Sequence, residues 1–155
     1  MKSSWSETDF DELGWHDSHV HGFRVLEGEH GTGELRLDLD YILEWLCPAG
    51  EGGACRFRIA PALLKFRDVT SLRFSLDYAT PTAAMGPFSI GGIEREPISY
   101  GSGYGSYRWT IPINWPAGEI TFESPGFTHM LTGSVVETDS QQLDESQRNG
   151  DSPVD

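Results

Sequence analysis

Residues 34–41 read Glu34-Leu35-Arg36-Leu37-Asp38-Leu39-Asp40-Tyr41, with an apolar residue at every odd position and a charged residue at every even one. Successive side chains of a β-strand point to opposite faces, so this alternation predicts a strand with one face buried and one face in water. Strands of parallel sheets, which are buried on both faces, read instead as continuous apolar runs. The pattern therefore favours an antiparallel sheet.

The same alternation recurs at 56–59, 72–78 and 119–123, and in shorter form at 64–66 and 107–113. The first strand is expected at 18–26 and the last at 127–136, and clusters rich in glycine and proline separate the strands. Eight or nine short strands with this punctuation predict an all-β fold, an antiparallel β-sandwich or a flattened barrel. The expected core residues are Val20, Phe23, Leu35, Leu37, Leu39, Tyr41, Phe57, Ile59, Leu64, Phe66, Leu72, Phe74, Leu76, Trp109, Ile111, Ile120 and Phe122.

The chain has 155 residues, which fits one domain, and a net charge of -13. More than half of this charge lies at the two ends. We expect a flexible acidic N-terminal segment at 1–13, a single β domain at 14–136 and a disordered acidic tail at 137–155. The tail contains one leucine, one valine and no aromatic residue, too little apolar surface to offset the entropy lost on ordering.

Composition excludes several classes of protein. A charge this negative repels phosphate backbones, so no nucleic acid is expected as a partner. No apolar run approaches the length of a membrane span, and the first residues lack the apolar core of a signal peptide, so a cytoplasmic location is expected. Cys47 and Cys55, on either side of residues 48–54, would stay thiols there, or close a small hairpin disulfide in an oxidising compartment.

The stretch Trp15-His16-Asp17-Ser18-His19-Val20-His21 holds three of the five histidines. Trp15, His16 and Asp17 form a motif at the entrance to the first strand, where His16 and Asp17 are expected to make hydrogen bonds. Asp17, His19 and His21 would share one face of the strand if it began at this point.

A His-x-His pair on a strand can chelate a divalent metal ion, because alternate side chains lie on one side. With Glu27 and His129, the pair His19 and His21 gives the pattern of a cupin-like metal site. The spacings differ from cupin motifs by one residue or more, which on a strand sends a side chain to the other face. The competing interpretation is that His19 and His21 are solvated and that no cofactor binds.

Two further groups could carry a function. Asp38 and Asp40 could act as an acid and a base, but arginines at 36, 56 and 58 are expected to hold both carboxylates ionised. Tyr100, Tyr104 and Tyr107 lie in a segment rich in glycine and serine, and such tyrosines form adaptable contact surfaces. The alternatives are that they cover the rim of a core built on Trp109, or that aromatic residues stack on sugars.

Residues 15–22, 35–43 and 64–72 resemble a group of small bacterial β proteins, namely the predicted toxin-immunity proteins of the immunity protein 50 type and YxiG-like proteins. The resemblance covers about half of the chain. It implies a bacterial cytoplasmic protein that binds and neutralises a basic toxin, with opposite charges speeding their encounter. No nucleophile or phosphate-loop motif is present. We therefore expect a non-enzymatic protein-binding module, with a cupin-like metalloprotein as the alternative.

Overall fold

The structure is a computed structural model that describes residues 1–49, 53–79, 84–101 and 103–149. Within these residues it is all-β, as predicted, and its ten strands form one antiparallel sheet. The strands are β1 (Ser4–Ser6), β2 (His19–Glu27), β3 (Gly33–Leu46), β4 (Arg56–Leu76), β5 (Phe88–Ile90), β6 (Glu94–Ser99), β7 (Gly105–Trp115), β8 (Gly118–Ser124), β9 (Gly126–Leu131) and β10 (Val136–Thr138). A 3-10 helix, η1 (Glu7–Glu12), follows β1, and a short helix, α1 (Glu145–Asn149), follows β10.

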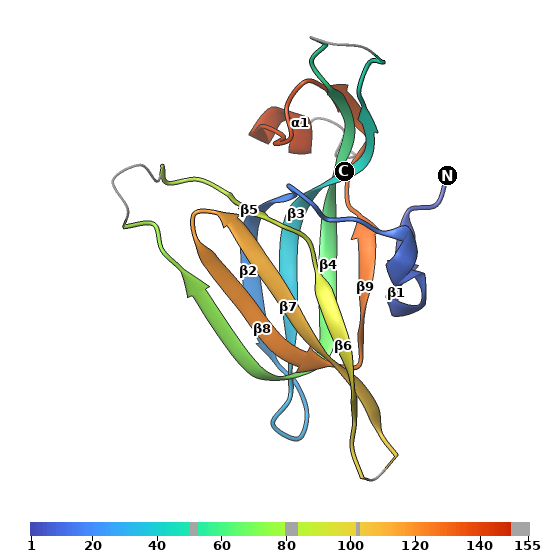
Figure 1. Ribbon diagram of the computed structural model, residues 1–155, viewed down its shortest axis with the longest axis vertical. Helices are drawn as coiled ribbons and strands as arrows, with labels where there is room; N and C mark the ends of the chain where they lie inside the picture. Colours follow the sequence, from blue (N-terminus) through green and yellow to red (C-terminus); the bar gives the residue numbers. More distant parts are fainter. Residues whose placement is uncertain (50–52, 80–83, 102, 150–155) are drawn as a thin grey trace.

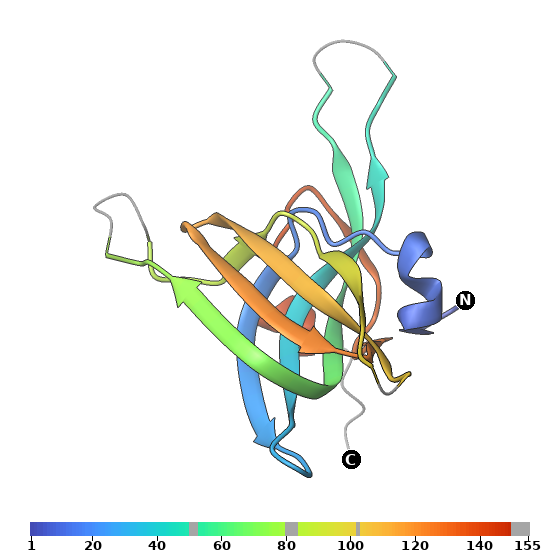
Figure 2. The same ribbon diagram turned by 60° about the horizontal axis from the view of Figure 1, so that its bottom comes forward.

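The sheet closes on itself. Six strands form a ring in the order β2, β3, β4, β8, β7 and β5, since β5 pairs with both β2 and β7 while β4 pairs with both β3 and β8. In Figure 1 the strands β7 and β8 lie in front of β2 and β3. The strands β9 and β1 continue the sheet from β4, and β6 continues it from β7 (Figure 2). The result is a flattened ring with two layers, one on each side of a core.

The alternating strand of the sequence is β3, and its odd residues face that core. Leu35, Leu37 and Leu39 are fully buried, and the rings of Phe66 and Trp109 meet 5.0 Å apart at the centre. Most of the expected core residues are buried. Leu72, Phe74 and Leu76 are half-buried and pack against the core. Phe23 is 46% exposed, because β2 pairs with β5 only at its first two residues and leaves this part of the ring open.

The N-terminal segment is ordered, which corrects the expectation of a flexible stretch at 1–13. Ser4–Ser6 pair with β9, and the ring of Trp5 lies 5.3 Å from that of His129. Ser6 and Asp9 form a capping box at the start of η1, which satisfies backbone N–H groups there. The aromatic residues Trp5 and Phe10 supply apolar contacts that offset the entropy of ordering.

The prediction of a disordered tail is likewise wrong for residues 137–149. Val136–Thr138 pair with the start of β4, and Leu143 is 1% exposed. Leu143 packs with Ile42, Phe57 and Ile59 into a small second core on the outer face of the sheet. One leucine is enough because the sheet already presents an apolar surface that it can cover. Residues 150–155, the rest of the predicted tail, lie outside the described residues.

Candidate functional site

Two exposed tyrosines of the β6–β7 hairpin stand beside a recess in the surface. Tyr100 and Tyr104 are 40% and 50% exposed, and their ring centroids lie 5.9 Å apart. The recess has a volume of about 300 Å³ and lies between this hairpin, the β2–β3 turn and β4. Its lining residues, which we call the tyrosine recess, are Thr32, Asp68, Thr70, Tyr100, Tyr104 and Ser106.

A bend in β4 places Asp68 in the tyrosine recess. Asp68 and Ser71 adopt the left-handed conformation, with φ of 49° and 54°. The strand β4 pairs with β9 up to Arg67. After the bend, from Thr70 onward, it pairs with β8 instead. A left-handed conformation is costly for a residue with a side chain, and such costs concentrate at functional sites. The bend thus brings a carboxylate beside the tyrosine pair.

A hydrogen bond fixes one of the two tyrosines. The Tyr100 hydroxyl donates to Glu123 Oε1 over 2.6 Å. This bond lowers the pKa of the Glu123 carboxyl and raises the pKa of the Tyr100 phenol, because it favours the charged form of the first and the neutral form of the second. At neutral pH the Glu123 carboxylate therefore accepts a hydrogen bond from the neutral phenol of Tyr100.

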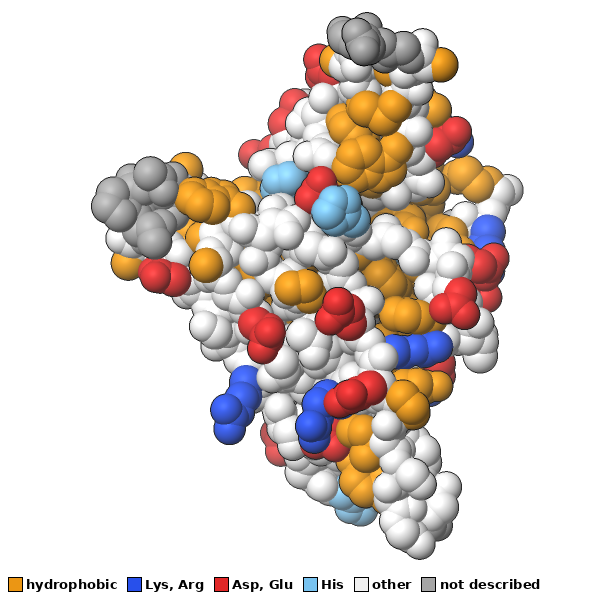
Figure 3. All heavy atoms as spheres, in the orientation of Figure 1, with side chains coloured by type: hydrophobic (Ala, Val, Ile, Leu, Met, Phe, Trp, Pro, Cys, Tyr) orange, Lys and Arg blue, Asp and Glu red, His pale blue; other side chains and the backbone are white. Residues whose placement is uncertain are grey.

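Asp68 is the charged residue in the lining of the tyrosine recess. Arg108 lies directly across the ladder from Glu96 on one side and Glu123 on the other. Asp68 makes no ion pair with any residue that the structure describes. Figure 3 shows hydrophobic side chains on the lower part of the β6–β7 hairpin, with charged ones beside them. Aromatic faces next to carboxylates can hold a cationic side chain.

Tyr107, the third tyrosine of the predicted contact surface, points elsewhere. It is half-buried, and the guanidinium of Arg95 lies 4.4 Å from its ring centroid. The same guanidinium lies 4.2 Å from the ring of Phe10 and 5.7 Å from that of Trp109. Tyr107 thus joins the N-terminal segment to the core, and only Tyr100 and Tyr104 come together at the surface.

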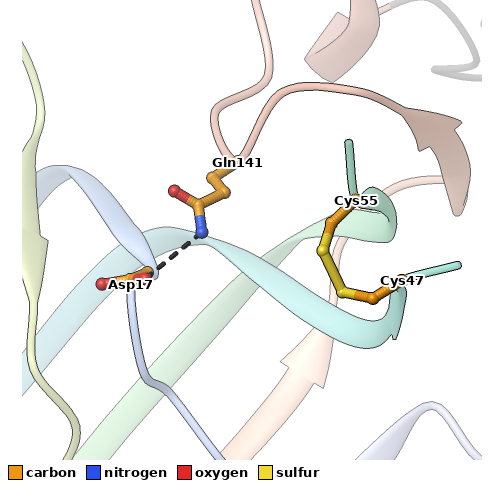
Figure 4. The surroundings of a disulfide bond; sticks show 4 residues. All are labelled: Asp17, Cys47, Cys55 and Gln141. Atoms are coloured by element: carbon orange, nitrogen blue, oxygen red, sulfur yellow. Dashed lines mark hydrogen bonds between the residues drawn. A yellow bond between two sulfur atoms is a disulfide. The ribbon is translucent and has the colours of Figure 1, made fainter. Parts of the chain in front are cut away.

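The motif at the strand entrance is built into the fold. Trp15 is 2% exposed, and Asp17 accepts hydrogen bonds from Asn114 Nδ2 at 2.9 Å and Gln141 Nε2 at 3.2 Å. Figure 4 shows the contact of Gln141, which follows β10, with Asp17. His16 Nε2 lies 3.4 Å from the same carboxylate. These bonds tie the start of β2 to β7 and to the C-terminal segment.

Asp40 lies fully buried beneath the C-terminal segment. Its Oδ2 accepts hydrogen bonds from His21 Nε2 at 2.6 Å and from the backbone N–H of Leu143 at 2.9 Å, and Arg148 binds its Oδ1. A buried carboxylate persists only when paired and hydrogen-bonded in this way. Asp40 therefore holds residues 143–148 against the sheet.

The predicted carboxylate pair is bound by a different arginine from those expected. Arg148 bridges Asp38 and Asp40, although it belongs to the segment predicted to be disordered. The expected arginines, Arg36, Arg56 and Arg58, bind Glu34, Glu137 and Glu44 instead. Both carboxylates are thus part of an ion-pair network rather than an acid and base in a cleft.

His129 lies in an aromatic enclosure inside the ring. It is fully buried, its Nδ1 accepts from Trp15 Nε1 at 3.4 Å, and Tyr41 lies 4.5 Å away between ring centroids. Burial lowers the pKa of His129 to about 4, so the ring is neutral at pH 7. Its Nε2 has no hydrogen-bond partner among the described residues.

The structure does not gather the four residues of the predicted metal site. His19 lies opposite Asp40 on the outer face, where His21 binds that carboxylate, whereas His129 lies opposite the fully buried Leu64 inside the ring. Glu27 ends β2 far along the strand. Burial lowers the pKa of His19, and the negative charge of Asp40 opposes this. Across residues 1–49, 53–79, 84–101 and 103–149, no three His, Cys, Asp or Glu residues are placed to hold a metal ion.

Cys47 and Cys55 form a disulfide in the structure, a pairing that the sequence left open. Their Cα atoms lie 4.2 Å apart, just beyond the last pair of the β3–β4 ladder, Leu46 and Arg56 (Figure 4). The bond closes the base of the loop between these strands.

Comparison with protein families, with curated proteins and with solved structures finds no significant match. None of the helices in the described residues has the length and apolar character needed to cross a membrane.

Sequence reasoning missed two residues of these sites. Arg67 and Asp68 interrupt the alternation between Phe66 and Val69, but this break does not show that β4 continues through a bend at Asp68. Arg148 stands alone among polar residues, and only the fold shows that it reaches two aspartates of β3.

Proposed function

We propose that this protein is a non-enzymatic binding module, immunity-like in role, that recognises a basic protein through the tyrosine recess. The observation that carries the proposal is the exposed pair Tyr100 and Tyr104 beside the carboxylate of Asp68. Lysine or arginine of a partner would enter the recess and meet both aromatic faces and a negative charge.

Charge and composition support such a partner. The net charge of -13 raises the rate of encounter with a positively charged protein. Tyrosine contributes a large contact area at a small cost in conformational entropy, and it is common among residues that dominate binding energy. Tyr100 is already oriented by Glu123, which reduces that cost further.

The histidines and buried carboxylate that were candidates for catalysis are used by the fold, which supports a binding role rather than an enzymatic one. His21 is hydrogen-bonded to Asp40, and Asp40 also accepts a hydrogen bond from the C-terminal segment. His129 is enclosed and neutral. A general base needs access to a substrate proton, which neither arrangement offers.

The test is titration of the purified protein, by calorimetry, with a peptide rich in lysine and arginine as the basic probe. The variant Tyr100→Ala/Tyr104→Ala is expected to bind at least about a hundredfold more weakly, and Asp68→Asn about tenfold more weakly. Trp115→Ala is the matched control, because Trp115 is also 50% exposed but does not line the recess. Unchanged affinity in the double variant, or an equal loss in Trp115→Ala, would refute the proposal.

The proposal includes a location in the bacterial cytoplasm. The disulfide favours a different location, because disulfides persist in oxidising compartments. In a reducing cytoplasm Cys47 and Cys55 would be two neighbouring thiols. Counting free thiols in protein isolated from its host under acid quench decides between the two. Two thiols per chain support the cytoplasm, and none supports an oxidising compartment.

A further inference from the structure

The outer face of the sheet carries three cationic side chains in a row. Arg24 of β2 lies directly opposite Arg36 of β3, which lies directly opposite Lys65 of β4. Their neighbours Leu35, Leu37, Leu64 and Phe66 are fully buried inside the ring, so the three cations share the face turned away from β7 and β8 (Figure 1). We call Arg24, Arg36 and Lys65 the cationic row.

Like charges directly opposite each other destabilise a sheet, so the cationic row lowers the stability of the fold. One acidic residue relieves part of it, because Glu34 binds Arg36 Nε at 2.7 Å. Arg24 and Lys65 make no ion pair with any residue in the described ranges. The chain as a whole has 11 basic residues against 24 acidic ones, so three basic side chains in adjacent positions across the sheet stand out.

A cavity of about 580 Å³ adjoins the cationic row. Its lining includes Arg24, Arg36 and Arg148, whereas Lys65 lies beside it, next to Arg36 on the neighbouring strand. Asp38 is the acidic residue of the lining, and its carboxylate is bound by Arg148. Pro61 and Leu63 of β4 supply an apolar part of the wall. The cavity therefore combines guanidinium groups with a surface that an organic group can cover.

We propose that the cationic row and this cavity bind a small organic molecule through its phosphate group. Guanidinium groups bind phosphate oxygens through paired hydrogen bonds, and the lysine adds a point charge. Three neighbouring cations match a doubly charged anion better than a singly charged carboxylate. Pro61 and Leu63 receive the organic part. This site lies apart from the tyrosine recess and does not depend on the function proposed for that recess.

The proposal is tested by NMR titration of the ¹⁵N-labelled protein with phenyl phosphate, using benzoate as the carboxylate counterpart. Phenyl phosphate at millimolar concentration is expected to give saturable shifts at residues 22–24, 36–38, 62–65 and 148. Arg24→Gln, which removes a guanidinium from the cavity lining, is expected to weaken binding about tenfold, and Lys65→Gln, outside the lining, by less. Both side chains lack ion-pair partners, so these variants keep the fold.

The matched control is Arg73→Gln, which removes an exposed basic residue of β4 that lies at a different place on the surface and makes no ion pair within the described residues. It should bind phenyl phosphate as the original protein does. An equal loss in Arg73→Gln, shifts that map elsewhere, or no saturable shift would overturn the proposal. Benzoate binding as tight as that of phenyl phosphate would overturn the assignment to phosphate.

Discussion

The two faces of β3 differ in a way that alternation alone does not reveal. On the inner face Leu35, Leu37 and Leu39 are equally and fully buried. On the outer face the side chain of Asp38 is 52% exposed, whereas Asp40, two residues along, is fully buried. The inner face is uniform because one core covers it, while the outer face is covered only where the C-terminal segment crosses it. Alternation thus assigns a residue to a face, and the covering segment decides whether that face is wet.

The sharpest test of this difference replaces each aspartate by alanine. Asp40→Ala is expected to lower the free energy of unfolding by about 3–5 kcal/mol, because it leaves Arg148 and His21 without their buried partner. Asp38→Ala should cost less than about 1 kcal/mol, as is usual for an exposed ion pair. Urea denaturation of both variants measures the two costs. Equal losses in the free energy of unfolding would show that Asp38 and Asp40 are equally exposed to solvent on the outer face.

The inner face can be tested through His129, the one histidine of the described chain that is enclosed by aromatic rings inside the sheet. Its pKa is about 4 in the fold against 6.5 when exposed, so the unfolded chain takes up a proton first as pH falls. The stabilisation from a neutral His129 is complete above pH 6.5 and is lost as pH falls towards 4. The loss amounts to about 3 kcal/mol.

Urea denaturation between pH 7 and pH 4 checks this, with His129→Gln as the comparison. The variant should lack the part of the pH dependence that His129 contributes, whatever its stability at pH 7. Parallel stability curves for the two proteins across this range would contradict the prediction.

The covering segment itself gives the smallest of the three effects. Leu143→Ala is expected to cost about 2 kcal/mol, because it removes one buried leucine from the small outer core but leaves the hydrogen bond to Asp40 in place. Glu145→Ala, an exposed change in the same segment, should alter stability by less than about 0.5 kcal/mol. Thermal unfolding of the two variants distinguishes them. A Leu143→Ala protein as stable as Glu145→Ala would mean that the outer core contributes nothing.

The fold class could be predicted from the sequence because the signal is local. In β3 each residue's face follows from its neighbours, and the glycine-rich turns mark the ends of strands. The strand order could not be predicted, since β4 looks like three short strands at 56–59, 64–66 and 72–78 but is one strand of 21 residues. Its bend at Asp68 depends on which strands pair with it.

The candidate sites were harder to predict because they combine distant residues. Tyr100 and Tyr104 of the predicted contact surface are exposed, and Tyr107 was grouped with them because the sequence cannot show that Arg95 covers it. The order of residues 137–149 was missed for a related reason. The composition of a segment shows how much apolar surface the segment itself has. It does not show how much apolar surface the sheet offers for it to cover.

The length of β4 also has a consequence for synthesis on the ribosome. Residues 56–76 form a hairpin ladder with β3 soon after they emerge, but their remaining partners are β8, β9 and β10, which end only at residue 138. Until more than forty further residues have been translated, the edge of β4 that these strands cover offers unpaired N–H and C=O groups to any other chain. Such edges are where nascent β proteins associate wrongly. For this molecule, the rate of elongation through residues 77–138 sets how long that exposure lasts.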